Sequence, residues 1–271
     1  MERHVKNQHY VPRFLLRNFS NDCENKIWCY DRAWKKAGNR SISNVASEDY
    51  FYDETPGKKD GSLEYFLANA ESFAAPLMKK IIEQKDLKLL SQEEKDIIAT
   101  FLSLQYKRTK VSLARTENIN QQLMDGINNW MQEIDSEIKF DSLSGKDLWR
   151  SAFSAASDLT SILVNKHWAL IESDNKFYTS DNPLVLYNAL PSPVRGNLGL
   201  NSKGIQMFLP LNPSIILGLF CEKIYQAPKE LNRCGQSEID FVNSLQVISA
   251  DRFVFSVDGD FSLVEDMLKN P

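Results

Sequence analysis

Apolar residues in the middle of the chain return with the period of an α-helix. From residue 62 to about residue 84 they recur every three or four positions, which is the spacing of a helix with one buried face. A second helix is expected to begin at Ser91, whose side chain can cap it while Glu94 reaches back to the cap, and to continue to about Glu137. A third helix is predicted over residues 145–165. The middle of the chain is therefore predicted to be helical.

Shorter apolar runs on both sides of this region predict β-strands. Two pairs of strands in the second half are separated by short turn segments, one at Asp174-Asn175 and one at Asn212-Pro213. Both pairs are predicted to form antiparallel hairpins. The predicted strands cover residues 26–32, 167–173, 176–181, 183–188, 204–211, 214–220 and 252–256. Residues 49–53 are predicted to be another short strand or an extended segment.

The order of these elements predicts the fold class. Helices grouped in the middle, followed by antiparallel strands, favour an α+β fold over a wound parallel sheet. Helix is expected to be the major component, packed against strands from the N-terminal segment and the C-terminal half. We expect one domain over residues 1–271, with short strands in residues 1–60, helices in 61–166, and strands with a helix in 167–271.

The composition is that of an ordinary globular protein. Of 271 residues, 42% are hydrophobic and 25% charged, and the formal net charge is −4. This balance provides no overall attraction to nucleic acid, although a local basic groove is compatible with it. The longest apolar run, residues 215–221, is far shorter than the roughly 20 residues that span a bilayer. Since the N-terminus has no signal-peptide pattern either, we expect a cytoplasmic protein that does not enter a membrane.

The cysteines do not predict a metal site. They form no CxxC pair, and neither of their two close spacings matches a zinc motif. Reduced thiols in a cytosol are the simplest interpretation. No metal ligand is assigned, and the sequence names no cofactor. The four residues are Cys23, Cys29, Cys221 and Cys234.

Two helices carry long polar side chains on the stripe that the pattern assigns to the core. Gln105 and Arg108 lie four and seven residues after Phe101 and share its face. Glu71 follows Leu67 by four residues on the preceding helix. Such groups need partners or a lined cavity, because unpaired burial is unfavourable. Arg108 either meets a ligand or ends the buried face and reaches water. Glu71 either titrates abnormally at a site or forms a structural ion pair with an arginine such as Arg108.

The segment Ser180-Asp181-Asn182-Pro183 ends a predicted strand. Asp and Asn before Pro favour a turn, which is a purely structural interpretation. A strand end is also a rigid support that presents side chains into a cleft. Asp181 is therefore also a candidate base or ligand, and Asn182 a candidate orienting amide.

Residues 9–19, HYVPRFLLRNF, mix basic and aromatic side chains near the N-terminus. Pro12 can start a short helix there. His9, just before it, can move protons near neutral pH. A histidine beside aromatic residues is also commonly a hydrogen-bonded packing residue, and both interpretations remain open.

Three motifs in this order resemble one family. HYVPRFLLRNF, the Gln105/Arg108 pair, and TSDNP downstream of Trp168 and Phe177 resemble the uncharacterised bacterial group catalogued as domain-of-unknown-function family 4238. The resemblance covers roughly residues 4–255 and includes the helix that carries Glu71. It implies that the polar segments belong together, and it implies no chemistry. This chain departs from the family with Arg13, where glutamine is frequent. The shared polar positions map onto His9, Tyr10, Arg17, Gln105, Arg108, Ser180, Asp181 and Asn182.

Two classes of function suit these residues. The first is a hydrolase acting on a phosphodiester or nucleotide, conceivable in a bacterial toxin or phage-defence setting, in which arginines hold phosphate and His9 or Asp181 moves the proton. A divalent metal on Glu71 and Asp181 is compatible with it, although no spacing requires one. The second is a non-catalytic module that binds a small anionic ligand or a partner protein. A third is a buried polar network that ties the N-terminal segment to the helices and sheet. The predicted catalytic residues are His9, Glu71 and Asp181, and the predicted substrate-binding residues are Tyr10, Arg17, Gln105, Arg108, Ser180 and Asn182.

Overall fold

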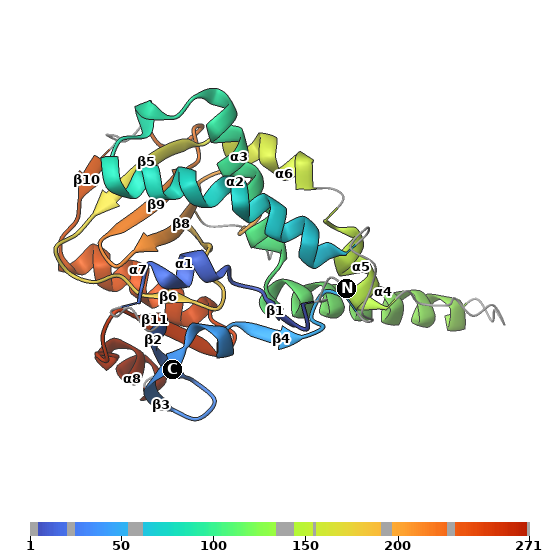
Figure 1. Ribbon diagram of the computed structural model, residues 1–271. Helices are drawn as coiled ribbons and strands as arrows, with labels where there is room; N and C mark the ends of the chain where they lie inside the picture. Colours follow the sequence, from blue (N-terminus) through green and yellow to red (C-terminus); the bar gives the residue numbers. More distant parts are fainter. Residues whose placement is uncertain are drawn as a thin grey trace, which may run out of the picture.

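A computed structural model describes residues 5–20, 25–53, 62–133, 144–153, 156–190, 197–226 and 231–269. Within these ranges the chain has an α+β fold, with helices from the middle of the chain packed on strands from both ends (Figure 1). None of the helices in these ranges combines the length and the apolar character that crossing a membrane requires.

The larger sheet has five strands. Its order is β10 (Leu231–Arg233), β5 (His167–Glu172), β9 (Ile215–Phe220), β8 (Ile205–Asn212) and β7 (Val185–Asn188). Neighbouring strands are antiparallel, except that β10 runs parallel to β5. The predicted hairpin through Asn212 and Pro213 is confirmed as β8–β9.

Helices cover both faces of this sheet. Because side chains alternate along a strand, Met207 and Leu209 of β8 face one side, where α2 (Leu63–Gln84), α3 (Gln92–Lys107) and α6 (Ala156–Val164) pack. Phe208, between them, lies in a separate apolar cluster with α7 (Gln236–Ser249). Figure 1 shows the sheet between these two helical layers.

The second sheet joins the two ends of the chain. Its order is β3 (Lys36–Ser41), β2 (Lys26–Asp31), β11 (Phe253–Ser256) and β6 (Thr179–Ser180), and all neighbours are antiparallel. The central pair is β2 with β11, so the middle of this sheet is made by segments from opposite ends. Helix α8 (Ser262–Lys269) follows β11.

The predicted hairpin through Asp174 and Asn175 is wrong. Strand β5 lies in the five-stranded sheet, whereas β6 lies in the other. The backbone between them bonds to other partners: the N–H of Phe177 donates to the carbonyl of Pro213, and that of Tyr178 to the side chain of Asn243. These long-range contacts carry the chain from one sheet to the next.

A third, two-stranded sheet holds the N-terminal segment. Strand β1 (Asn7–His9) pairs with β4 (Ser47–Asp49), and α1 (Arg13–Arg17) follows β1. The sequence predicts a short strand or an extended segment over residues 49–53, but β4 ends at Asp49. Tyr50 has a left-handed backbone (φ 54°), and the N–H of Tyr52 donates to the side chain of Gln8. Short 3-10 helices lie at Ile42–Asn44 (η1) and Leu87–Leu89 (η2).

The long second helix is divided at Arg108. The predicted capping box of Ser91 and Glu94 is present at the start of α3, but α3 ends at Lys107 and α4 (Lys110–Glu133) begins anew. Thr109 explains the break, because its hydroxyl accepts a hydrogen bond from the N–H of Ser112 and so caps α4. Residues 145–165 are likewise two helices, α5 (Gly145–Ser151) and α6. The break places Arg108 at a helix end beside the N-terminal strand.

Candidate functional site

Arg108 is the centre of a buried polar cluster. Its side chain is 2% exposed, and each guanidinium nitrogen has a partner. Nη1 donates to Oε1 of Glu71 at 2.6 Å, Nη2 to the carbonyl oxygen of His9 at 2.6 Å, and Nε to the Tyr52 hydroxyl at 3.0 Å. The Tyr52 hydroxyl in turn donates to the same carbonyl of His9 at 3.1 Å. The ion pair between Glu71 and Arg108 that the sequence left open is therefore formed.

This cluster keeps Arg108 charged although it is buried. Burial alone disfavours the guanidinium cation, but Tyr52 and Glu71 outweigh it and raise the pKa of Arg108 above its ordinary value. Glu71 remains 24% exposed, so the pair lies at the boundary between core and solvent. The N-terminal strand, α2 and the end of α3 meet at this point.

Gln105 extends the cluster by one helical turn. Its Nε2 donates to the carbonyl of Tyr10 at 3.1 Å. Its Oε1 is buried and has no hydrogen-bond partner among the described residues. Such an atom is unusual in a folded protein, because desolvation of an unpaired acceptor is unfavourable. Gln105 and Arg108 together fix the backbone of residues 9 and 10.

Glu64 belongs to the same cluster and was missed in the sequence. Burial raises its pKa to about 7, the charge of Arg108 opposes that rise, and the charges of Glu71 and Asp53 add to it. Its Oε2 is buried without a partner among the residues that the structure describes. Glu64 precedes Glu71 by seven residues, so both lie on one face of α2. That spacing was the available signal.

The imidazole of His9 lies at the edge of this cluster. It is half-buried, and its Nε2 is 3.1 Å from the carbonyl oxygen of Ile42. Burial lowers the pKa of His9 below its usual value, and the Ile42 carbonyl opposes this effect. The positive charges of Arg13, Arg108 and Arg17 lower the pKa further. His9 is therefore neutral at pH 7, and in the tautomer that donates from Nε2 its Nδ1 carries the free lone pair.

Arg17 is on the surface, away from the buried bonds of Arg108. It is exposed, and its Nε donates to Oδ1 of Asn25 at 3.1 Å. Arg13 is exposed on the same short helix, four residues earlier. Tyr10, by contrast, is buried, and Lys110 Nζ is 5.6 Å from its ring centroid. Burial raises the pKa of Tyr10, and the charge of Asp181 adds to the rise.

Ser180, Asp181 and Asn182 form a second polar cluster, at the end of β6. The carboxylate of Asp181 accepts three backbone hydrogen bonds of 2.7–2.8 Å, from Asp251, Arg252 and Phe253. Burial raises the pKa of Asp181 to about 6 while these N–H groups oppose the rise, so the carboxylate is ionised at pH 7. The SDNP turn thereby fixes the approach to β11.

Two amide side chains on α7, Gln246 and Asn243, complete this second cluster, and the sequence did not predict them. Gln246 accepts from the Ser180 hydroxyl at 2.7 Å and donates to the carbonyl of Pro183. Asn182 donates to the carbonyl of Ser249 at the end of the helix. Buried amides on an apolar helix face were the only available signal, and Gln246 and Asn243 share it.

The nine predicted site residues thus occupy three environments. His9, Tyr10, Glu71, Gln105 and Arg108 are linked through the cluster around Arg108. Ser180 and Asn182 are hydrogen-bonded to α7, and Asp181 is hydrogen-bonded to the start of β11. The negative charge of Asp181 also raises the pKa of Tyr10, which links the two clusters electrostatically. Arg17 lies on the surface beside them. Within the described ranges, no three His, Cys, Asp or Glu side chains are grouped so as to hold a metal ion.

Comparisons with known proteins bear on the family of this chain. A search of curated proteins and a search of solved structures each found no match. One family model matches residues 7–260, a span that contains both polar clusters. The chain therefore belongs to the family described as "Protein of unknown function (DUF4238)".

Proposed function

We propose that the protein is a hydrolase acting on a phosphodiester or nucleotide, with His9 as the general base. One observation carries the proposal: a half-buried, neutral imidazole lies among three arginines at the end of β1. A base that is unprotonated at pH 7 can take a proton from water. Nearby guanidinium groups favour an anionic substrate.

The proposed roles follow from the contacts. Arg17, exposed on α1, binds the phosphate, while Arg108 holds the backbone of His9 through its carbonyl. His9 Nδ1 takes a proton from a water molecule as the water oxygen bonds to phosphorus, and the bond to the leaving oxygen breaks. That oxygen takes a proton from solvent. Glu71, Gln105 and Tyr10 act through this framework as positioning residues.

In this proposal Asp181 does not transfer a proton. Its two oxygens already accept hydrogen bonds from three backbone N–H groups, so protonation of the carboxylate would weaken those hydrogen bonds. Asp181 therefore positions the β11 region, together with Ser180 and Asn182. The proposed setting is a bacterial cytoplasm, and a toxin or phage-defence role is part of the same hypothesis.

A second candidate is a non-catalytic module that binds a small anionic ligand or a partner protein. One observation favours it: Arg108 and Asp181, the buried charged groups at the centre of the two clusters, already have all their hydrogen bonds within the protein. Only the exposed arginines of α1 would then meet the ligand. Under this alternative His9 is a packing residue.

The experiment is an assay of purified protein on DNA, RNA and nucleotides, with and without Mg²⁺ or Mn²⁺. The informative variant is His9→Ala, and the matched control is His167→Ala, a half-buried histidine on β5. Hydrolysis that is lost only in His9→Ala, with the circular dichroism spectrum unchanged, supports the enzyme. Nucleotide binding without turnover supports the binding module. Wild-type protein that neither hydrolyses nor binds any of these substrates overturns both.

A further inference from the structure

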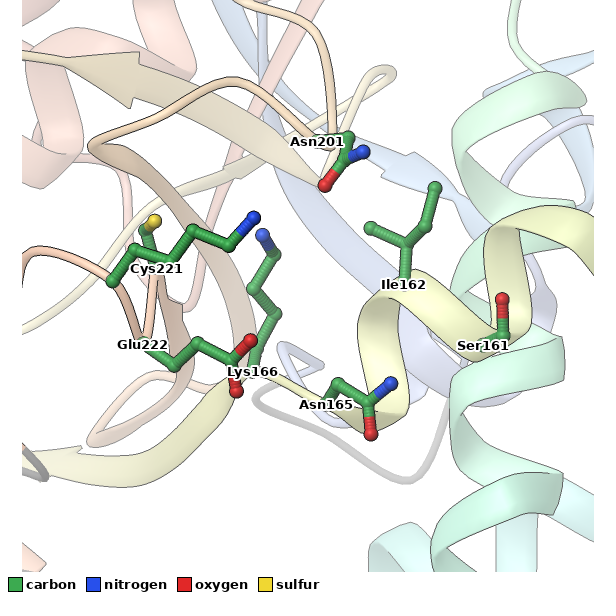
Figure 2. Close-up of a pocket in the computed structure, with 8 residues that line it drawn as sticks. Ser161, Ile162, Asn165, Lys166, Asn201, Cys221 and Glu222 are labelled. Atoms are coloured by element: carbon green, nitrogen blue, oxygen red, sulfur yellow. The ribbon is translucent and has the colours of Figure 1, made fainter.

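A small pocket lies where the end of α6 meets the end of β9, and no part of the proposed function uses it. It has a volume of about 140 Å³, which is space for about four or five water molecules. Figure 2 shows Lys166 with Asn201 and Asn165 on one side of it and Cys221 and Glu222 on the other. Its lining is therefore mainly polar.

Lys166 is a buried cation that no carboxylate pairs with in the described part of the chain. The residue is 8% exposed, and its ammonium group lines the pocket rather than lying sealed in the core. Figure 2 shows its side chain extending toward the space between Cys221 and Asn201. Burial of an unpaired ammonium group is unfavourable. This one lines the pocket, where the negative charge of Glu222 also acts on it.

Cys221 supplies the complementary group. The backbone N–H groups of Gly204, Lys223 and Ile224 stabilise negative charge on its sulfur, and so does the charge of Lys166. Although burial raises the pKa of this thiol, these interactions outweigh it and bring the pKa below the ordinary value.

The other described cysteines are in the opposite situation. Burial raises the pKa of Cys29 to about 12, and burial also raises the pKa of Cys234. Cys29 is fully buried in a hydrophobic cluster. Of the three free thiols in the described ranges, only Cys221 combines a cation, backbone donors and an adjoining pocket.

We propose that Cys221 is an oxidation site that reacts with small hydroperoxides, with Lys166 as the proton donor. The thiolate attacks one oxygen of the peroxide, a sulfur–oxygen bond forms, and the oxygen–oxygen bond breaks. Sulfur is oxidised to sulfenic acid, and the peroxide is reduced. The leaving hydroxide takes a proton from the Lys166 ammonium group and departs as water, after which Lys166 regains a proton from solvent.

Two features support this assignment of roles. Burial lowers the pKa of Lys166, the charges of Cys221 and Glu222 oppose that lowering, and the charge of Lys223 adds to it. The net pKa is below the ordinary value, so the proton of Lys166 is given up more readily than that of a surface lysine. The pocket has room for a reactant of a few non-hydrogen atoms, which suits hydrogen peroxide. Neither feature depends on the site around His9.

The test is treatment of the full chain with hydrogen peroxide and a dione reagent that traps sulfenic acid, followed by peptide mass spectrometry. Labelling at Cys221 is expected to exceed that at Cys29 by at least tenfold, because the thiolate fraction sets the rate. Alkylation of Cys221 by iodoacetamide at varied pH should give an apparent pKa below that of an unperturbed thiol. Cys221 labelled no faster than Cys29, or an apparent pKa above that value, overturns the proposal.

Variants separate charge from proton donation. Lys166→Arg keeps the positive charge but cannot give up a proton, so it should retain the low alkylation pKa and slow peroxide oxidation about tenfold. Lys166→Met should raise the alkylation pKa, whereas Lys203→Met, an exposed lysine, should change neither measurement. Should Lys166→Met not fold, Lys166→Gln removes the same charge with a polar side chain and should likewise raise the alkylation pKa of Cys221. Peroxide oxidation in Lys166→Arg at the wild-type rate refutes the donor role.

Discussion

Replacing Glu64 with glutamine removes a carboxyl group whose ionisation the native fold opposes. The pKa of Glu64 is near 4.5 in the unfolded chain, whereas burial raises the pKa to about 7 in the native protein. The native state thus binds more protons between these values, so this group's contribution to stability is full below pH 4.5. That contribution falls as the pH rises through about 7 and is constant above.

The magnitude follows from the two pKa values. At about 1.4 kcal/mol for each factor of ten in proton affinity, a change from 4.5 to about 7 corresponds to roughly 3 kcal/mol. Glu64→Gln cannot ionise and keeps nearly the same shape. It should match the wild type near pH 4.5 and have a free energy of unfolding roughly 3 kcal/mol higher at pH 8.

The assay is urea denaturation of both proteins at pH 4.5, 6, 7 and 8, comparing midpoints at unchanged slope. Glu83→Gln is the matched control, since Glu83 lies on the same helix but is exposed. It should show no such divergence. A difference between Glu64→Gln and wild type that does not grow with pH refutes the reasoning. A less stable variant at pH 8 would mean that Glu64 is ionised and favourably paired with Arg108.

Three further predictions follow from the two clusters. Glu71→Ala leaves Arg108, whose side chain is 2% exposed, without its carboxylate partner. The free energy of unfolding, measured from the urea midpoint, should fall by about 2–3 kcal/mol. This loss is smaller than for a fully buried ion pair, because Glu71 is partly exposed. Asp181→Asn replaces one of the two oxygens that accept from the N–H groups of residues 251–253 with an NH2 donor. It should cost about 3 kcal/mol by the same measurement, and an unchanged midpoint would contradict a stabilising role for these three hydrogen bonds. Because the pKa of His9 is lowered, hydrolysis should rise with pH and then level off, with its midpoint below about pH 6.5. A midpoint above that value would contradict the role of His9 as base.

The sequence predicted the elements whose signals are local. The capping box of Ser91 and Glu94 and the β8–β9 hairpin depend on residues within a few positions of each other, and both are formed. The inward positions of Gln105 and Arg108 followed from helical periodicity, which any buried partner would satisfy. Their actual partners, two backbone carbonyls of the N-terminal segment, lie about a hundred positions away.

The wrong predictions concern backbone N–H groups that bond to residues far away in the sequence. The turn at Asp174 and Asn175 has the composition of a hairpin, yet Asn243 and Pro213 take the neighbouring N–H groups and redirect the chain. Glu64 was overlooked because a glutamate in the first turn of a helix is ordinarily a solvent-exposed residue that favours the helix dipole. Its spacing of seven residues from Glu71 places both on one face of α2, but the burial of Glu64 arises from the approach of other segments, which that spacing does not encode.

The pairing of β2 with β11 has a consequence for synthesis of the chain. The register of Asp31 with Phe253 closes a loop of roughly 220 residues, and contacts so distant in sequence slow folding. On the ribosome, β2 is complete early but waits for almost the whole polypeptide before its central neighbour emerges. Until then it has β3 on one side and an open edge on the other, so a nascent chain stalled before residue 253 should be bound by chaperones or degraded. Complete translation is in this way a condition for a native second sheet.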